Sequence, residues 1–345
     1  MRRKLIITLL LLSGLVSAQA SLQVEKPQFS AAVATDLGET KFAEVRSRLG
    51  TSLPFQLGEQ LTYEMKLSRF PIYGTIGTLT FTVNEGQMQT ATAVNNDKPA
   101  TDTSATATST STSTSPPATT AESATTSSEN NKNPLWKFVI DINSKGILTS
   151  LFRIKVNDEY TSYVDKSDFG VIKTIKKIEE GKRRRENIAD FDRQQRKVKW
   201  IDTDLNSPMK ATQTKEKDTF NWVTDIVSGW YVLRAQQLTV GKSLVLPISD
   251  NGETYEISVD VLEKEQFESE LGKFSTLKVE MKIFGGKIIK RKGRLFVWVT
   301  DDQRHLPVRA QIKSNFGTVT GTLIEMKSVK PVETERPPQE GKTGL

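Results

Sequence analysis

The sequence contains no cysteine and only one histidine, His305, among its 345 residues. The lack of cysteine excludes disulfides, thiol nucleophiles and cysteine-ligated zinc, and a single imidazole excludes metal sites built from several histidines. Any Ser-His-Asp triad would have to use His305, which directly precedes Leu306-Pro307 in a predicted turn. We predict no catalytic residue, no metal and no cofactor.

Long hydrophobic runs are also scarce, and the clearest one lies at the N-terminus. Arg2-Arg3-Lys4 precedes an apolar stretch that ends near Val16, and Ala18-Gln19-Ala20 offers small residues at a cleavage position. This order is typical of a secretory signal peptide, and the stretch is shorter than the roughly 20 residues of a spanning helix. We predict a signal peptide over residues 1–20, an exported mature chain that is periplasmic or extracellular, and no transmembrane span after cleavage.

The excess of positive charge is modest. The formal charge of +7 includes the three basic residues of the leader, so the mature chain carries about +4. Nucleic-acid-binding domains usually have a stronger basic excess, and export would separate the chain from nucleic acid. We expect no nucleic-acid partner and consider lipid or another envelope component as the partner. The sequence carries no signal of oligomeric state.

Large apolar side chains almost disappear between residues 87 and 133, where Thr, Ser and Ala dominate. Such a segment cannot offset the entropy of ordering, so we predict a disordered insertion. A stalk carrying O-linked sugar and a neutral expansion of a surface loop both fit this composition. The rest divides into an N-terminal extension over 21–53 with a short amphipathic helix over 42–49, one β-rich domain over 54–328 and a disordered tail over 329–345.

Alternating polar and apolar residues dominate the predicted domain. The first strand covers residues 61–67, and the alternation returns over 78–83 and 136–142, which we expect to pair across the insertion. Further strands follow as far as residue 324, and Asp250-Asn251-Gly252 marks a hairpin turn. We predict a mainly β fold built on one large curved antiparallel sheet, open or a half-barrel.

One segment has helical spacing instead. Ile226, Trp230 and Leu233 recur at i, i+4 and i+7, and Asp225 precedes them as a candidate N-cap. We predict one amphipathic helix near residues 225–238, packed on the sheet.

A curved sheet that does not close leaves an apolar concave face, which this helix can cover. Five aromatic residues are candidate ligand contacts on that face: Tyr63, Phe81, Phe138, Trp230 and Tyr231. Such a pocket would hold an acyl chain or another apolar ligand, with the helix as a lid. The alternative is that these side chains simply fill the core, which is the commoner role of buried aromatics.

The densest basic run consists of Lys182, Arg183, Arg184 and Arg185, and follows Gly181 in a predicted hairpin. One interpretation is contact with anionic lipid headgroups or envelope polymers. The other is a solvated edge strand that its charge protects from unwanted pairing.

Short motifs spread over residues 54–327 share their order with one known family. They are Pro54-Phe55-Gln56-Leu57-Gly58-Glu59-Gln60-Leu61-Thr62-Tyr63, Tyr160-Thr161-Ser162-Tyr163-Val164-Asp165, Trp230-Tyr231-Val232-Leu233-Arg234, Leu271-Gly272-Lys273-Phe274, Trp298-Val299-Thr300-Asp301-Asp302-Gln303-Arg304-His305-Leu306-Pro307-Val308-Arg309 and Phe316-Gly317. On these motifs the chain resembles the bacterial exported family called domain of unknown function 3108. The resemblance implies an exported β-sheet protein with no assigned activity.

Two functions fit these features. The leading hypothesis is an exported, non-enzymatic cell-envelope protein that binds an apolar or amphipathic ligand, or a partner, on its curved sheet. The alternative is a carboxylate-dependent enzyme acting on envelope polysaccharide, which needs two of the 41 acidic residues although no pattern marks them. An open apolar face favours the first, and a groove that holds two carboxylates favours the second.

Overall fold

The computed structural model describes residues 42–49, 53–87, 134–151, 153–207, 212–289, 292–315 and 317–332. The predicted signal peptide, nearly all of the Thr/Ser-rich insertion and most of the predicted tail lie outside these ranges. Strands dominate the described part of the chain.

Fifteen strands form one sheet in the described residues. In chain order they are β1 (Gln60–Arg69), β2 (Ile72–Gly86), β3 (Leu135–Ser144), β4 (Asn157–Asp165), β5 (Val171–Glu180), β6 (Arg183–Asp192), β7 (Lys197–Asp204), β8 (Gln213–Asp218), β9 (Thr224–Asp225), β10 (Ser243–Asp250), β11 (Glu253–Ser269), β12 (Gly272–Met281), β13 (Gly293–Thr300), β14 (Pro307–Ser314) and β15 (Gly317–Lys327). Each strand pairs with its neighbours in sequence, except that β15 returns to β1 while β8 and β9 form the two edges. The prediction of one large open sheet is confirmed.

The alternation that predicted the first strands also sets their register. β1 buries its odd-numbered apolar side chains from Leu61 to Leu67. β2 and β3 pair as predicted, with Leu79 opposite Ile142, although the long insertion separates the two strands. The entropy of loop closure grows slowly with loop length, so this hairpin can tolerate the insertion.

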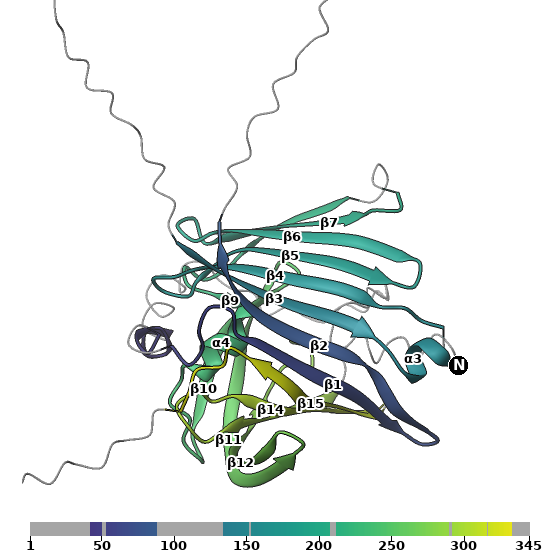
Figure 1. The fold of residues 1–345 in the computed structure, drawn as a ribbon. Coiled ribbons are helices and arrows are strands. Elements are labelled where there is room, and N and C mark those ends of the chain that lie inside the picture. The colour runs from purple at the N-terminus through teal and green to yellow at the C-terminus, as the bar shows by residue number, and fades with distance from the viewer. Residues whose placement is uncertain are drawn as a thin grey trace, which may run out of the picture.

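The sheet curves until the β10–β11 hairpin meets β5 and β7, and Figure 1 shows β1–β7 as one curved layer above β10–β15. Asn251 and Gly252 in the hairpin turn both have positive φ, 51° and 76°, as a tight hairpin turn requires. Gly252 lies against Trp200, where a Cβ atom would lie 2.7 Å from the Trp200 Cβ and 3.3 Å from the nearest indole atom. Asp250 forms a buried ion pair with Lys176 of β5. Side chains therefore join the two wings of an otherwise open half-barrel.

Helix α4 covers only Ser228–Arg234 and is shorter than the helix predicted near residues 225–238. The residues just before it, Thr224–Asp225, form β9 and pair in parallel with β10, so strand pairing takes the segment that was predicted to start the helix. The Asp225 carboxylate still accepts a hydrogen bond from the amide of Ser228, at 2.9 Å. The prediction of Asp225 as the N-cap is wrong, because α4 starts after Val227, which has no side-chain capping hydrogen bond, and Asp225, which lies in β9, reaches only the first residue of the helix.

Two further short helices are described, α3 (Ile147–Ser150) and one over residues 42–47. Phe42, Val45 and Leu49 are all buried, as their spacing predicted, and the Phe42 ring lies 5.2 Å from that of Phe220. The packed body of the protein therefore begins before residue 54. No helix in the described ranges has the length and hydrophobicity needed to cross a bilayer.

Candidate functional site: an apolar cavity beside helix α4

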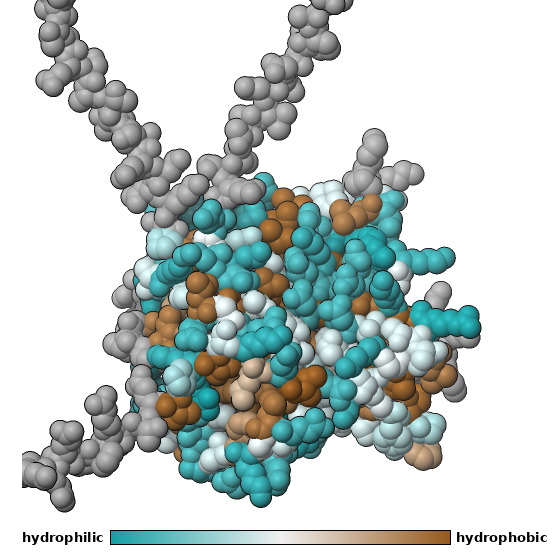
Figure 2. All heavy atoms as spheres, in the orientation of Figure 1, coloured by the Kyte–Doolittle hydropathy of each residue, from teal (hydrophilic) through white to brown (hydrophobic). Residues whose placement is uncertain are grey.

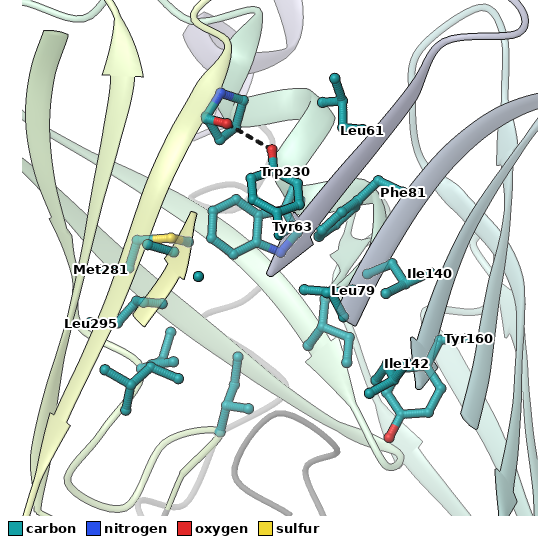
Figure 3. Close-up of a pocket in the computed structure, with 18 of the residues that line it drawn as sticks. Leu61, Tyr63, Leu79, Phe81, Ile140, Ile142, Tyr160, Trp230, Met281 and Leu295 are labelled. Atoms are coloured by element: carbon teal, nitrogen blue, oxygen red, sulfur yellow. Dashed lines mark hydrogen bonds between the residues drawn. The ribbon is translucent and has the colours of Figure 1, made fainter. Parts of the chain in front are cut away.

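A cavity of about 160 Å³ lies inside the curved sheet next to α4. One wall comes from β1–β4, and the other from β12–β15 with the loop after β12 (Figure 3). The walls are mostly aliphatic and aromatic, with Leu79, Ile142, Met281, Leu295 and Ile312 among them. These residues face inward because side chains alternate along each strand.

Neighbouring residues of α4 have different surroundings. Trp230 is half-buried and lines the cavity, with its ring edge-to-face with Phe81 at 6.3 Å between centroids. Tyr231 is fully buried and stacks on Phe138, with 4.0 Å between centroids and 14° between planes. Its other neighbour is the edge of Phe55, at 5.0 Å. Because successive helical residues point about 100° apart, one turn of α4 reaches both regions.

Four of the five predicted ligand contacts line the cavity: Tyr63, Phe81, Trp230 and Tyr231. Phe138 does not line it, because it lies behind Tyr231 and is completely buried. The alternation in β3 indicated that Phe138 faces inward, but it carries no information on how deep the side chain lies. The wall formed by Met281 and Ile312 was not predicted, since aliphatic strand residues have the same sequence pattern whether they fill a core or line a cavity.

A buried ion pair lies at the α4 end of the cavity, where Arg234 is part of the wall. The Arg234 guanidinium donates two hydrogen bonds to the Glu59 carboxylate, at 2.5 and 3.1 Å, and the two side chains are 2% and 1% exposed. Arg234 also donates to the backbone carbonyls of Pro54 (2.9 Å) and Arg304 (3.1 Å). The pair links α4 to the entry of β1 and to the β13–β14 turn. Sequence spacing gave no sign of it, because the two residues are 175 positions apart.

Two other polar side chains near this end are also held inside the protein. The Tyr63 hydroxyl donates to the Pro307 carbonyl at 2.7 Å, and burial raises the pKa of Tyr63 well above its usual range. His305 Nδ1 donates to the Arg234 carbonyl at 2.8 Å, and burial lowers the pKa of this imidazole. At neutral pH both groups are therefore uncharged. The His305 contact fixes the β13–β14 turn against α4, and the Tyr63 contact fixes it against β1.

No acidic residue of the described ranges lines the cavity. Glu59 lies behind Arg234 and is committed to the ion pair. Asp158 on β4 has a pKa that burial raises to about 7, but it is not part of the cavity wall. Within the described ranges no three acidic or histidine side chains are grouped so that they could hold a metal ion. A carboxylate pair for glycoside hydrolysis is thus not found at this cavity.

The basic run lies at the turn between β5 and β6, and most of its charge is paired within the chain. Arg183 contacts Glu180 at 2.9 Å and Arg184 approaches Glu179 at 3.6 Å. Arg185 makes two hydrogen bonds to Asp202, at 2.7 and 2.5 Å. Lys182 is exposed at the turn itself. The run is therefore a ladder of cross-strand ion pairs with one cation at its tip.

Comparison with solved structures finds similar chains of low identity, among them the following two. One is a β-barrel-like protein from Brucella abortus, of domain of unknown function DUF1849, with 9% identity and a TM-score of 0.47, covering 80% of this chain and all of that one. The other, from Bacteroides fragilis, is provisionally described as an exported protein with a YmcC-like fold, with 9% identity and a TM-score of 0.30, covering 80% of this chain and 98% of that one. No curated protein matches the sequence significantly.

A family model gives a match that covers more than half of the chain. It is the model of DUF3108, a family of proteins of unknown function, and it matches residues 115–324. The resemblance described from the motifs extends further towards the N-terminus, to residue 54, and the part within the matched range is confirmed. The chain belongs to the DUF3108 family.

Proposed function

We propose that the protein is an exported, non-enzymatic component of the cell envelope that binds the apolar chain of a lipid or similar amphiphile in the cavity beside α4. The observation that carries this proposal is the chemistry of the walls. Aliphatic and aromatic side chains make up nearly all of the lining, and no carboxylate of the described residues faces the cavity. Apolar cavities of this kind exclude water and accept apolar guests.

The size of the cavity supports an occupant. Because the cavity is partly open to solvent, leaving its about 160 Å³ unfilled costs at most about 4 kcal/mol, the cost of an enclosed core cavity of that volume. That is a large fraction of the roughly 5–15 kcal/mol by which native domains are stable. A bound acyl segment would restore the missing contacts, so ligand binding and stability should be linked.

Recognition in this cavity would depend on shape rather than on hydrogen bonds. Arg234 donates to Glu59 and to two backbone carbonyls, and the Tyr63 hydroxyl donates to Pro307. These polar groups are already satisfied within the protein, so a headgroup gains little by entering. We expect the apolar chain to enter and the polar end of the ligand to stay outside.

Two consecutive residues of β14 offer a matched pair of substitutions. Ala310 lines the cavity, whereas Gln311 faces the opposite side of the strand. A phenyl ring at position 310 would occupy the space that the ligand needs. We expect mass spectrometry of organic extracts to find lipid in the wild-type protein and in Gln311→Phe, and not in Ala310→Phe.

The thermal midpoint of each variant distinguishes a blocked cavity from a damaged fold. Lipid-free Ala310→Phe should be at least as stable as the lipid-free wild-type protein, because filling a cavity restores packing. Wild-type protein that carries no lipid after gentle purification would contradict the proposal. Equal amounts of lipid in Ala310→Phe and Gln311→Phe would contradict it as well.

A further inference from the structure

The turn between β1 and β2 projects two exposed aromatic side chains. Phe70 is 84% exposed and Tyr73 is 58% exposed. The ladder between β1 and β15 ends at Ser68, and the ladder between β2 and β3 begins only at Gly77. The tip of this hairpin therefore extends beyond the strands on both sides.

The segment that contains α3 lies against this hairpin. The Lys145 amide donates to the Ile76 carbonyl at 3.0 Å, and a Cβ atom on Gly74 would lie 3.1 Å from the Ile147 side chain. Leu151, directly after α3, is 66% exposed. Figure 2 shows brown and pale atoms at the lower right, where Figure 1 places this hairpin. Single exposed apolar residues are ordinary, but three large ones around a projecting turn indicate a contact surface.

The charge around this tip is positive. Residues 65–84 and 142–157 contain five basic residues and no acidic one. The five are Lys66, Arg69, Lys145, Arg153 and Lys155. Glu64 pairs with Lys66 at 2.9 Å and with Lys145 at 3.6 Å, and Glu270 lies near Lys66. Glu180 lies opposite Val156, next to Lys155, and a net positive charge remains after these three acids are counted.

The end of the sheet at which the β1–β2 turn lies also reaches the cavity. Arg69 lies beside Gly317 in the β14–β15 turn, where a Cβ atom would be 2.8 Å from the Arg69 side chain. Ser314, on the other side of that turn, pairs with Gly293 at the end of the β12–β13 loop. Ile289 in this loop lines the cavity. Helix α4 lies towards the other end (Figure 1).

We infer that this edge of the protein docks on a bilayer that contains anionic phospholipid, with Phe70 and Tyr73 entering the interface. Aromatic side chains favour the headgroup level of a bilayer, and basic residues close to an anionic surface add to the attraction. Neither contribution depends on what the cavity holds, so the inference goes beyond the proposed function. Docking in this orientation would bring the loop that lines the cavity close to the lipid surface.

Because the chain has no cysteine, a single engineered one can be labelled specifically with an environment-sensitive fluorophore. We choose Phe70→Cys at the tip, Lys182→Cys at the basic β5–β6 turn and Leu57→Cys near the α4 edge, where Leu57 is 54% exposed. The protein, purified after export, is mixed with vesicles of phosphatidylcholine or of phosphatidylcholine and phosphatidylglycerol in a three-to-one ratio. We expect a blue shift and an intensity increase for the label at 70 with the anionic vesicles, weakened by high salt, and none for the label at 57.

A second measurement uses vesicle sedimentation of unlabelled variants. Phe70→Ser/Tyr73→Ser should bind anionic vesicles roughly ten-fold more weakly or worse, since two aromatic side chains lose their burial, whereas Leu57→Ser should bind like wild type. The inference is wrong if the protein binds neither kind of vesicle, or if the label at 57 responds as strongly as that at 70. It is also wrong if only the label at 182 responds, because the basic turn would then be the contact.

Discussion

On one side of α4 the interior is filled, and on the other side it holds a cavity. The filled side packs Tyr231 against Phe55 and Phe138, with Phe169 6.0 Å from Phe55. On the open side, Trp230 lines the cavity of about 160 Å³. Both sides are lined by the same kinds of apolar residue, so composition does not distinguish them.

The difference separates residues that stabilise the fold from residues that are free for binding. Side chains on the filled side gain nearly the full packing energy, and Tyr231, which is 2% exposed, borders the cavity with only part of its surface. Side chains at the cavity forgo part of that energy, which a ligand can supply. The buried pair Arg234–Glu59 lies at the end of the cavity and ties α4 in place. Substitutions on the two sides should therefore have different consequences.

The largest loss of stability is expected from Arg234→Met. This change leaves Glu59, which is 1% exposed, as a buried carboxylate without its partner. Removing one partner of a buried ion pair lowers the free energy of unfolding by about 3–5 kcal/mol. Urea denaturation should show this loss, and the double variant Arg234→Met/Glu59→Leu should recover much of it, because both charges are gone. A single variant as stable as wild type would show that the pair does not hold α4.

The next comparison uses the two aromatic neighbours on α4. Tyr231→Ala removes a fully buried ring and should lower the free energy of unfolding by about 3–4 kcal/mol. Trp230→Ala removes a half-buried ring and should lower it by about 1–2 kcal/mol. Lipid retention should fall in Trp230→Ala. Denaturant midpoints and extracted lipid, measured on both variants, test this directly. Equal stability losses would mean that the cavity side is packed as tightly as the filled side.

The dependence of stability on pH gives a further comparison. Burial raises the pKa of Asp158 to about 7 in the folded protein, against about 3.9 in an unfolded chain. Between these values the folded state holds a proton that the unfolded state has lost, so the free energy of unfolding falls as pH rises from about 4 to about 7, by up to about 1.4 kcal/mol per pH unit.

The variant Asp158→Asn isolates this effect, because it removes the titrating group and keeps the oxygen that accepts from the Glu179 amide at 2.7 Å. Its stability, measured by urea titration from pH 4 to pH 8, should decline less than that of wild type. Parallel pH profiles for the two proteins would show that Asp158 does not carry a raised pKa.

Local patterns predicted most of the sheet but not its two edge strands. Alternation located β1, β2 and β3, and Asp250-Asn251-Gly252 located the hairpin turn, because both signals depend on neighbouring residues. The edge strand β8 was missed, since its sequence Gln213–Asp218 is polar throughout and has no apolar face. The helix was predicted at the right position but too long. The residues expected to begin it form β9 and pair with β10, and this tertiary contact leaves no signal in the local sequence.

The candidate site was predictable only in part. Tyr63, Phe81 and Trp230 were identified because aromatic residues on inward-facing positions are few. The buried position of Phe138 and the pairing of Arg234 with Glu59 depend on the curvature of the whole sheet. No spacing in the sequence encodes that curvature, so depth and long-range polar contacts could not be derived.

The central claim is that the cavity beside Trp230 binds an apolar chain, and quenching of Trp230 by a brominated fatty acid tests it most directly. The bromine quenches indole emission at contact, and the variant Trp230→Phe reports the contribution of the other tryptophans. The account predicts saturable quenching at one ligand per protein in the wild type, largely lost in Trp230→Phe and in the blocked variant Ala310→Phe. Quenching that is absent in the wild type, or equal in all three proteins, would contradict it.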